Sequence, residues 1–108
     1  MKIKINDFTW DVQAVSREHE KLKTRDDYPC LGITYCGDLS IYINKTLHKE
    51  LFRSTVIHEL LHAYTFSFGV HLFADEHNEE PIADFVGSHL DQIYNHVNLI
   101  MDKVYRNG

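Results

Sequence analysis

The chain has 108 residues, 44% hydrophobic, 12% aromatic and 25% charged, a composition typical of one small globular domain. It carries 11 Lys and Arg against 16 Asp and Glu, a formal net charge of −5 without a basic stripe, which argues against a nucleic-acid partner. No apolar run is long enough to cross a bilayer, and the N-terminus lacks a signal-peptide pattern, so we expect a cytoplasmic protein with no membrane partner. The two cysteines, Cys30 and Cys36, are too few for a disulfide scaffold and are expected to be free thiols.

The N-terminal part of the chain has the patterns of short strands. Apolar and charged residues alternate over Lys2–Ile5, and the aromatic and β-branched residues of Phe8–Val15 follow the turn pair Asn6-Asp7, so we expect a hairpin. The polar run 16–27 predicts a solvated loop with room for one helical turn.

A second pair of strands is predicted over residues 31–35 and 39–43. They are joined through Cys36, Gly37 and Asp38, and the glycine can adopt the positive φ that a tight hairpin requires. Three or four short strands therefore precede the first long helix.

Two long helices are predicted in the second half of the chain. Apolar residues recur at spacings of three and four before Gly69, so we expect a buried helix that is capped by Asn44 or Thr46 and ends near that glycine. Asn78 can cap the second helix, and Pro81 is tolerated in its first turn. The second helix has an apolar stripe on one face, formed by Val86, Leu90, Ile93, Val97, Ile100 and Val104.

The first helix carries His58, Glu59 and His62 in the pattern His-Glu-Leu-Leu-His. Residues four apart lie on the same side of a helix, so both imidazoles can reach one metal ion while Glu59 projects beside them. Zinc is the expected metal, one ion per chain, because it accepts imidazole nitrogen and polarises a bound water that an adjacent carboxylate can deprotonate. The alternative is a helix whose two histidines only form hydrogen bonds or face solvent.

A catalytic zinc site generally needs a third protein ligand, and Glu80 at the start of the second helix is the expected one. Asp84 follows one turn later on the same face, where an outer carboxylate can accept the second ring proton of a metal-bound histidine. Acidic residues also favour helix N-termini without any metal, so His77, Glu79 and Asp75 stay open as alternative ligands.

The segment 41–85 resembles the ImmA/IrrE-type metallopeptidases, compact gluzincins of phages and mobile elements. Three motifs carry the resemblance: Ile-Tyr-Ile-Asn, His-Glu-Leu-Leu-His and Glu-x-x-Ala-Asp. It implies that His58 and His62 bind zinc together with Glu80. It also implies that Glu59 is the catalytic base.

Asp84 departs from the pattern of that family, in which many members carry Asn at this position. An aspartate can still accept the proton of a histidine, so the change alters the charge around the metal more than the geometry. Family members with a known role cleave helix-turn-helix repressors. The resemblance therefore implies a regulatory endopeptidase with a protein substrate, such as a repressor of that type.

Two other functions stay open. His77 follows His62 by 15 residues, a spacing similar to that of SprT-like proteases, so a SprT-like zinc protease with His77 as third ligand is one alternative. The other is a catalytically idle zincin-like domain that uses zinc for stability and binds a host or repressor protein. Glu59 argues against the idle domain, because a purely structural site needs no general base.

Further polar residues near the motif are candidates for stabilising the oxyanion or contacting substrate: His71, His77 and Tyr64. His89 and His96, on the second helix, are expected to be partly buried or solvent-facing rather than bound to metal.

The expected fold is α+β and zincin-like, with a small, mainly antiparallel sheet of three to four strands packed on two long helices in one domain over 1–108. The metal would lie between the helices and the edge of the sheet. An edge strand beside it would let an extended peptide add as a further strand, and residues 31–35 or 39–43 could supply that edge.

Overall fold

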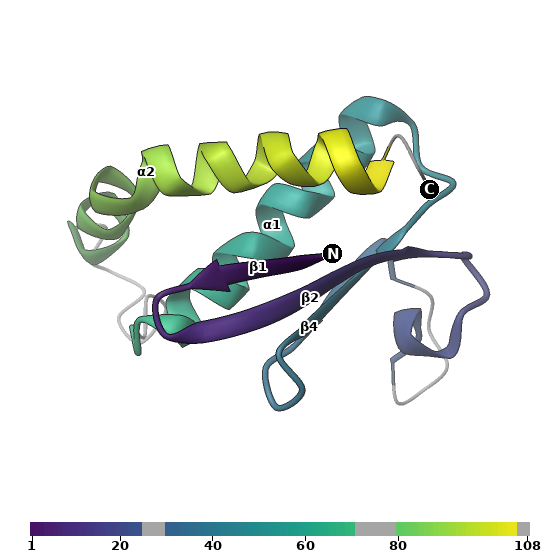
Figure 1. The fold of residues 1–108 in the computed structure, drawn as a ribbon, viewed down its shortest axis with the longest axis horizontal. Coiled ribbons are helices and arrows are strands. Elements are labelled where there is room, and N and C mark those ends of the chain that lie inside the picture. The colour runs from purple at the N-terminus through teal and green to yellow at the C-terminus, as the bar shows by residue number, and fades with distance from the viewer. Residues whose placement is uncertain (25–29, 71–79, 106–108) are drawn as a thin grey trace.

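The computed structural model describes residues 1–24, 30–70 and 80–105 (Figure 1). Its elements in chain order are β1 (Lys2–Ile5), β2 (Phe8–Val15), the 3-10 turn η1 (Glu20–Leu22), β3 (Gly32–Tyr35), β4 (Ser40–Asn44), α1 (Lys49–Ser67), α2 (Glu80–Ile100) and the π-helical turn η2 (Met101–Tyr105). Within these ranges, no helix combines the length and apolarity needed to cross a membrane.

The four strands form one sheet in the order β1-β2-β4-β3. The pairs β1/β2 and β3/β4 are antiparallel, as the two predicted hairpins require. The central pair β2/β4 is parallel, from Asp11 opposite Ser40 to Val15 opposite Asn44. The expectation of a mainly antiparallel sheet is therefore corrected to a mixed sheet, because strand patterns within each hairpin do not specify how two hairpins meet.

Both helices contribute to one hydrophobic core with the sheet, which confirms the α+β class. Helix α1 packs against β1, β3 and β4, while α2 crosses α1 and continues into η2, which reaches β2 (Figure 1). The strands alternate between the core and the outer face, as their period of two requires. The core-facing strand residues are Ile3, Ile5, Trp10, Val12, Ile41 and Ile43.

The turn of the second hairpin differs from its prediction. Gly37 has no positive φ, and Leu39 instead adopts the left-handed conformation with a φ of 54°. In the first hairpin the turn residue Asn6 has the same φ of 54°, which asparagine tolerates well. A glycine inside a tight turn therefore shows where the chain reverses without fixing which residue takes the left-handed conformation.

The loop between the hairpins contains η1, in agreement with the predicted helical turn. Its Leu22 is fully buried, and the Tyr35 hydroxyl donates a 2.7 Å hydrogen bond to the carbonyl of Lys21. This part of the loop therefore packs against β3 and β4 and is less solvated than its polar sequence indicated. Residues 25–27 of the predicted loop lie outside the described ranges.

Helix α1 ends as predicted but begins differently. Its N-cap is His48, which makes no side-chain capping bond. Asn44 Oδ1 instead accepts hydrogen bonds from the backbone nitrogen and hydroxyl of Thr46, at 2.9 and 2.7 Å, and this forms a turn before the helix. At the other end Phe68 is the C-cap, and Gly69 has a φ of 67°, the left-handed conformation that commonly ends helices.

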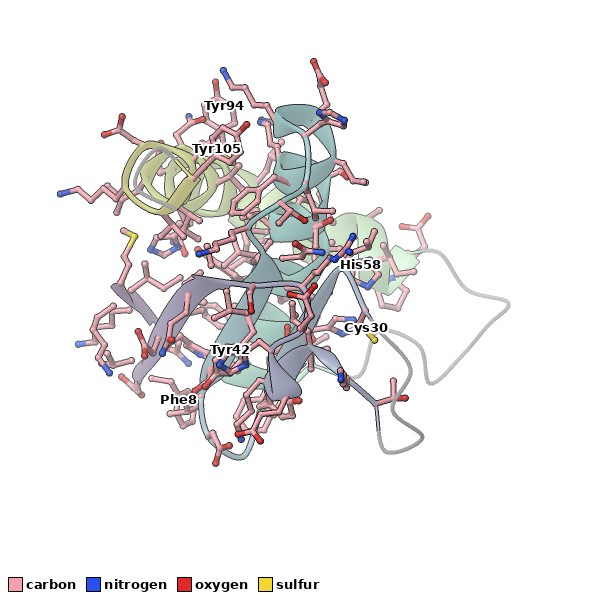
Figure 2. The ribbon with its side chains drawn as sticks, turned by 90° about the vertical axis from the view of Figure 1, so that its right-hand side faces the viewer. Phe8, Cys30, Tyr42, His58, Tyr94 and Tyr105 are labelled. Carbon is pink, nitrogen blue, oxygen red and sulfur yellow. The ribbon has the colours of Figure 1, made fainter. Side chains whose placement is uncertain are left out.

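Helix α2 is buried mainly in its C-terminal half. Leu90 of the predicted stripe is 54% exposed although Ile93, three residues later, is buried, and Tyr94 projects away from the sheet (Figure 2). Pro81 lies in the first turn, as expected, while the predicted cap Asn78 is outside the described residues. The stripe residues that are buried are Ile93, Val97, Ile100 and Val104.

Candidate functional site

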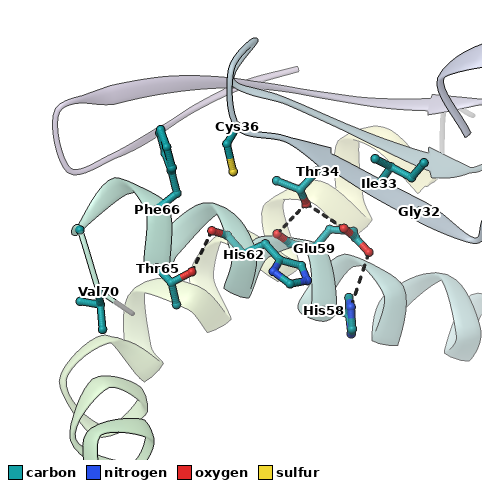
Figure 3. A pocket seen from close by; sticks show the side chains of 11 residues that line it. Gly32, Ile33, Thr34, Cys36, His58, Glu59, His62, Thr65, Phe66 and Val70 are labelled. Carbon is teal, nitrogen blue, oxygen red and sulfur yellow. Dashed lines mark hydrogen bonds and ion pairs between the residues drawn. The ribbon is translucent and has the colours of Figure 1, made fainter. Parts of the chain in front are cut away.

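Helix α1 presents two imidazoles on its exposed side. His58 and His62 are one turn apart, their ring centroids are 5.0 Å from each other, and both residues are exposed (Figure 3). This is the arrangement expected from a spacing of four in a helix. Glu59 lies beside them on the side of the helix that faces β3, and it is only 6% exposed.

The carboxylate of Glu59 is held by the edge strand. Thr34 Oγ1 lies 2.8 Å from Glu59 Oε1 and 3.1 Å from the Glu59 carbonyl oxygen, so the hydroxyl proton is donated to one or shared between the two acceptors (Figure 3). The second carboxylate oxygen, Oε2, lies 3.9 Å from His58 Nε2. Thr34 thus fixes the carboxylate in an orientation that leaves one oxygen near the imidazole of His58.

Gly32 lets β3 approach α1 closely enough for this contact. A Cβ atom at Gly32 would lie 2.7 Å from Thr55 Cγ2 and 3.1 Å from Glu59 Cγ. The first distance is shorter than real Cβ contacts, so a larger residue would push the strand away from the helix. Neither Gly32 nor Thr34 was singled out from the sequence, although their spacing of two within a predicted strand places them on the same face.

Among the described strands, β3 is the edge of the sheet beside the histidines, whereas β4 is central. The backbone nitrogen of Asn44 donates a 2.9 Å bond to the Leu31 carbonyl, and bonded pairs alternate in an antiparallel ladder. The backbone groups of Ile33 therefore also point toward β4. Those of Gly32 and Thr34 point to the open edge. Of the two ranges considered from the sequence, only 31–35 provides the edge.

A cleft of about 650 Å³ lies between β3 and α1, with His58, Glu59 and His62 in its lining. A smaller cleft of about 340 Å³ shares Gly32, His58 and Glu59 with it and extends toward the start of α1. Cys36 faces the larger cleft as a free thiol, in line with the sequence prediction, and burial raises its pKa. The histidine pair and Glu59 thus lie in a groove rather than on a flat surface.

Tyr64 is placed differently from the prediction that it could contact the oxyanion or substrate. It is fully buried between the helices, and its hydroxyl is hydrogen-bonded to His96 Nδ1 at 2.5 Å. Tyr64 follows His62 by two residues, which turns it about 200° around the helix, away from the cleft. Burial raises the pKa of Tyr64 to about 12 and lowers that of His96. His96 and His89 are partly buried, as predicted.

The predicted third ligand lies at the start of α2. Glu80 and Asp84 are both exposed there, and Glu80 is not among the residues that line the cleft. Over 1–24, 30–70 and 80–105, no group of three or more His, Cys, Asp or Glu residues is close enough to hold a metal ion. The described residues thus bring two of the three predicted ligands together, and Glu80 as third ligand stays a prediction. The alternative ligands Asp75, His77 and Glu79 lie outside the described residues, and so does His71, a candidate for contacting the oxyanion or substrate.

The residues at the cleft supply two of the three protein ligands that a catalytic zinc site needs. Two accessible imidazoles one helical turn apart can coordinate one zinc ion, and a carboxylate beside them suits a general base rather than a further ligand.

No family model, curated protein or solved structure matches this chain. Its function therefore has to be inferred from its own residues and from the motifs they form.

Proposed function

We propose that the protein is a zinc-dependent endopeptidase. The observation that supports this proposal is the pairing of the exposed His58 and His62 with a buried Glu59, which is held by a hydrogen bond in a groove beside the edge strand β3. A helix whose histidines only face solvent has no need of a buried carboxylate next to them, because burying a carboxylate is unfavourable.

The residues have separate roles in this proposal. His58, His62 and Glu80 hold the metal, and Asp84 accepts a ring proton from one of the histidines. Zinc, when bound, polarises a water molecule and the carbonyl of the peptide bond. Glu59 accepts the proton of that water and passes it to the leaving amine, as a general base and then a general acid. Thr34 keeps the Glu59 carboxylate oriented during both transfers.

The outer edge of β3, at the end of the described sheet, provides a binding mode for the substrate. An extended peptide can add to β3 as a fifth strand of the sheet, hydrogen-bonded to the outward backbone groups of Gly32 and Thr34. This addition would bring a peptide carbonyl next to Glu59, because Thr34 itself contacts that side chain. Cleavage would then require a substrate segment that is extended or can become so.

A regulatory protein is the proposed substrate, and a helix-turn-helix repressor is the first candidate. This choice follows the resemblance of the His-Glu-Leu-Leu-His and Glu-x-x-Ala-Asp motifs to the ImmA/IrrE-type metallopeptidases. The net charge of −5 argues against direct binding of the repressor's DNA.

The metal content of the purified protein tests whether the chain binds zinc. After reconstitution with Zn²⁺ and removal of excess metal, elemental analysis should find about one zinc per chain, and His58→Ala or His62→Ala should abolish it. His48→Ala is the matched control, since His48 is also exposed but is the N-cap of α1, ten residues before His58. Wild-type protein without zinc would refute the proposal.

The variant Glu59→Gln separates a peptidase from a binding protein. Glutamine nearly preserves the shape of the side chain and removes the base, so the variant should keep fold and zinc but lose cleavage. The assay incubates a helix-turn-helix repressor encoded beside the gene with each protein and searches for new peptide termini by mass spectrometry. Equal inactivation of the repressor by both proteins, without new termini, would favour the catalytically idle zincin-like domain.

A further inference from the structure

The groove on either side of Glu59 has apolar walls. Leu31 and Leu51, which are 47% and 42% exposed, line the smaller cleft toward the start of α1. Phe66, 44% exposed, and Val70 line the larger cleft toward the end of α1 (Figure 3). Large apolar side chains are thus accessible in the two clefts that meet at the candidate catalytic residue, and such patches mark binding surfaces.

Among the residues that the structure describes, the charged groups of the groove are confined to its centre. Apart from Glu59 and the two histidines, the described lining of both clefts consists of apolar, hydroxyl, thiol and glycine residues. Away from Glu59 and the two histidines, a charged side chain of a substrate would lose hydration without gaining a partner of opposite charge among the described lining residues. An apolar side chain would instead remove both its own surface and that of the cleft walls from water.

The register of β3 determines which side chains of an added strand point into the clefts. Within β3, only Gly32 and Thr34 offer backbone groups to a new strand. The side chain of Thr34 and the Cβ position of Gly32 both face α1. Residues paired with Gly32 and Thr34 would direct their side chains to the same face of the sheet, toward α1. The residue between them, opposite Ile33, would point to the other face.

We propose that this groove selects extended peptides with bulky apolar side chains at alternate positions, one for each cleft flanking Glu59. The inference deepens the proposed function, since it names the class of segment that the peptidase would cleave. The two apolar side chains must be at positions i and i+2 or i and i+4 of the peptide. An odd difference in position would turn one of them toward the outer face of the sheet.

Peptide binding tests this proposal without requiring cleavage. Fluorescein-labelled peptides of about twelve residues, built from Ser and Thr with two leucines placed two, three or four residues apart, are titrated against the Glu59→Gln protein in the presence of Zn²⁺, with anisotropy as the readout. The even-spaced peptides should bind about tenfold more tightly than the odd-spaced peptide, which can bury only one leucine at a time. A pair of glutamates at the even positions should give no gain over serine.

Variants of the cleft walls identify the binding surface. Leu51→Ser should weaken binding of the even-spaced peptides about fivefold, and so should Phe66→Ser in the other cleft. Val70→Ser is a second variant for the larger cleft, because Phe66 also packs on Trp10 and its loss could disturb the fold. Leu90→Ser is the matched control, a leucine 54% exposed on α2, and should have no effect.

Equal affinity for even and odd spacing would overturn the inference, as would an equal loss on Leu90→Ser. These results are independent of the zinc and cleavage assays. A chain that binds zinc and cleaves its substrate but shows no spacing preference would retain the proposed function and lose this inference. A chain that prefers even spacing but binds no zinc would retain the peptide groove and lose the peptidase.

Discussion

Replacing Gly32 by alanine tests how closely β3 is packed against α1. The new methyl group would lie 2.7 Å from Thr55 Cγ2 and 3.1 Å from both Glu59 Cγ and Ile43 Cδ1. The Thr55 methyl cannot rotate away easily, because Thr55 is 7% exposed and its hydroxyl donates a 2.7 Å bond to the Leu51 carbonyl. Overpacking of this kind costs about 1–3 kcal/mol, and we expect the free energy of unfolding to fall by about 2 kcal/mol.

The stability of the Gly32→Ala variant can be measured by urea denaturation, with the fluorescence of the fully buried Trp10 as the signal. Gly37→Ala is the control, because no described atom lies within 4 Å of its added Cβ and its φ is not positive, and it should change stability by less than about 0.5 kcal/mol. Adding Thr55→Ser to Gly32→Ala removes the clashing methyl and should restore more than half of the loss. If Gly32→Ala is as stable as Gly37→Ala, the close packing of β3 on α1 is refuted.

Three further predictions concern other contacts. Ser67→Ala removes the 2.9 Å partner of the buried Trp10 indole N–H, so urea denaturation should show a loss of about 1–3 kcal/mol and the tryptophan emission should shift. Burial holds the pKa of His96 below its usual 6.5, so the unfolded chain takes up its proton first as pH falls; stability should decrease as pH falls through 6.5, and less so in His96→Gln. In zinc competition titrations Glu80→Ala should weaken binding by more than the roughly 10- to 100-fold typical of an outer partner such as Asp84, whereas a larger loss for His77→Ala would favour the SprT-like alternative.

The strands could be predicted because their signals are local. Alternation of apolar and charged residues depends only on the period of a strand, and the bounds of β1 and β2 agree with the prediction. The pairing of β2 with β4 could not be predicted, since it joins segments about thirty residues apart and depends on how both hairpins pack against α1. The same limit applies to Leu90, whose exposure follows from where α2 lies over the core rather than from its position in the stripe.

In the candidate site, too, the features set by local sequence could be predicted and those set by the tertiary fold could not. The proximity of His58 and His62 follows from helix geometry alone, so the spacing in the sequence was sufficient to predict it. Thr34 is 25 residues from Glu59 in the chain, and its contact with that carboxylate exists only because β3 is the edge strand over α1. Tyr64 is close to the motif in sequence, which makes it a candidate contact for the oxyanion or substrate, but its position around the helix directs it into the core.

Glu59 is the residue at which the stability of α1 and its chemistry conflict. It lies on the buried face of the helix, together with Thr55, Val56 and Leu60, where an apolar side chain would contribute to packing. A buried carboxylate is unfavourable unless it is hydrogen-bonded and near positive charge, and Thr34 supplies one hydrogen bond to it. A zinc ion on His58 and His62 would supply the positive charge, since Glu59 Oε2 is already 3.9 Å from His58 Nε2. Residues that are unfavourable for stability at their position are expected at functional sites, and Glu59, a carboxylate on the buried face of α1, is also the proposed general base.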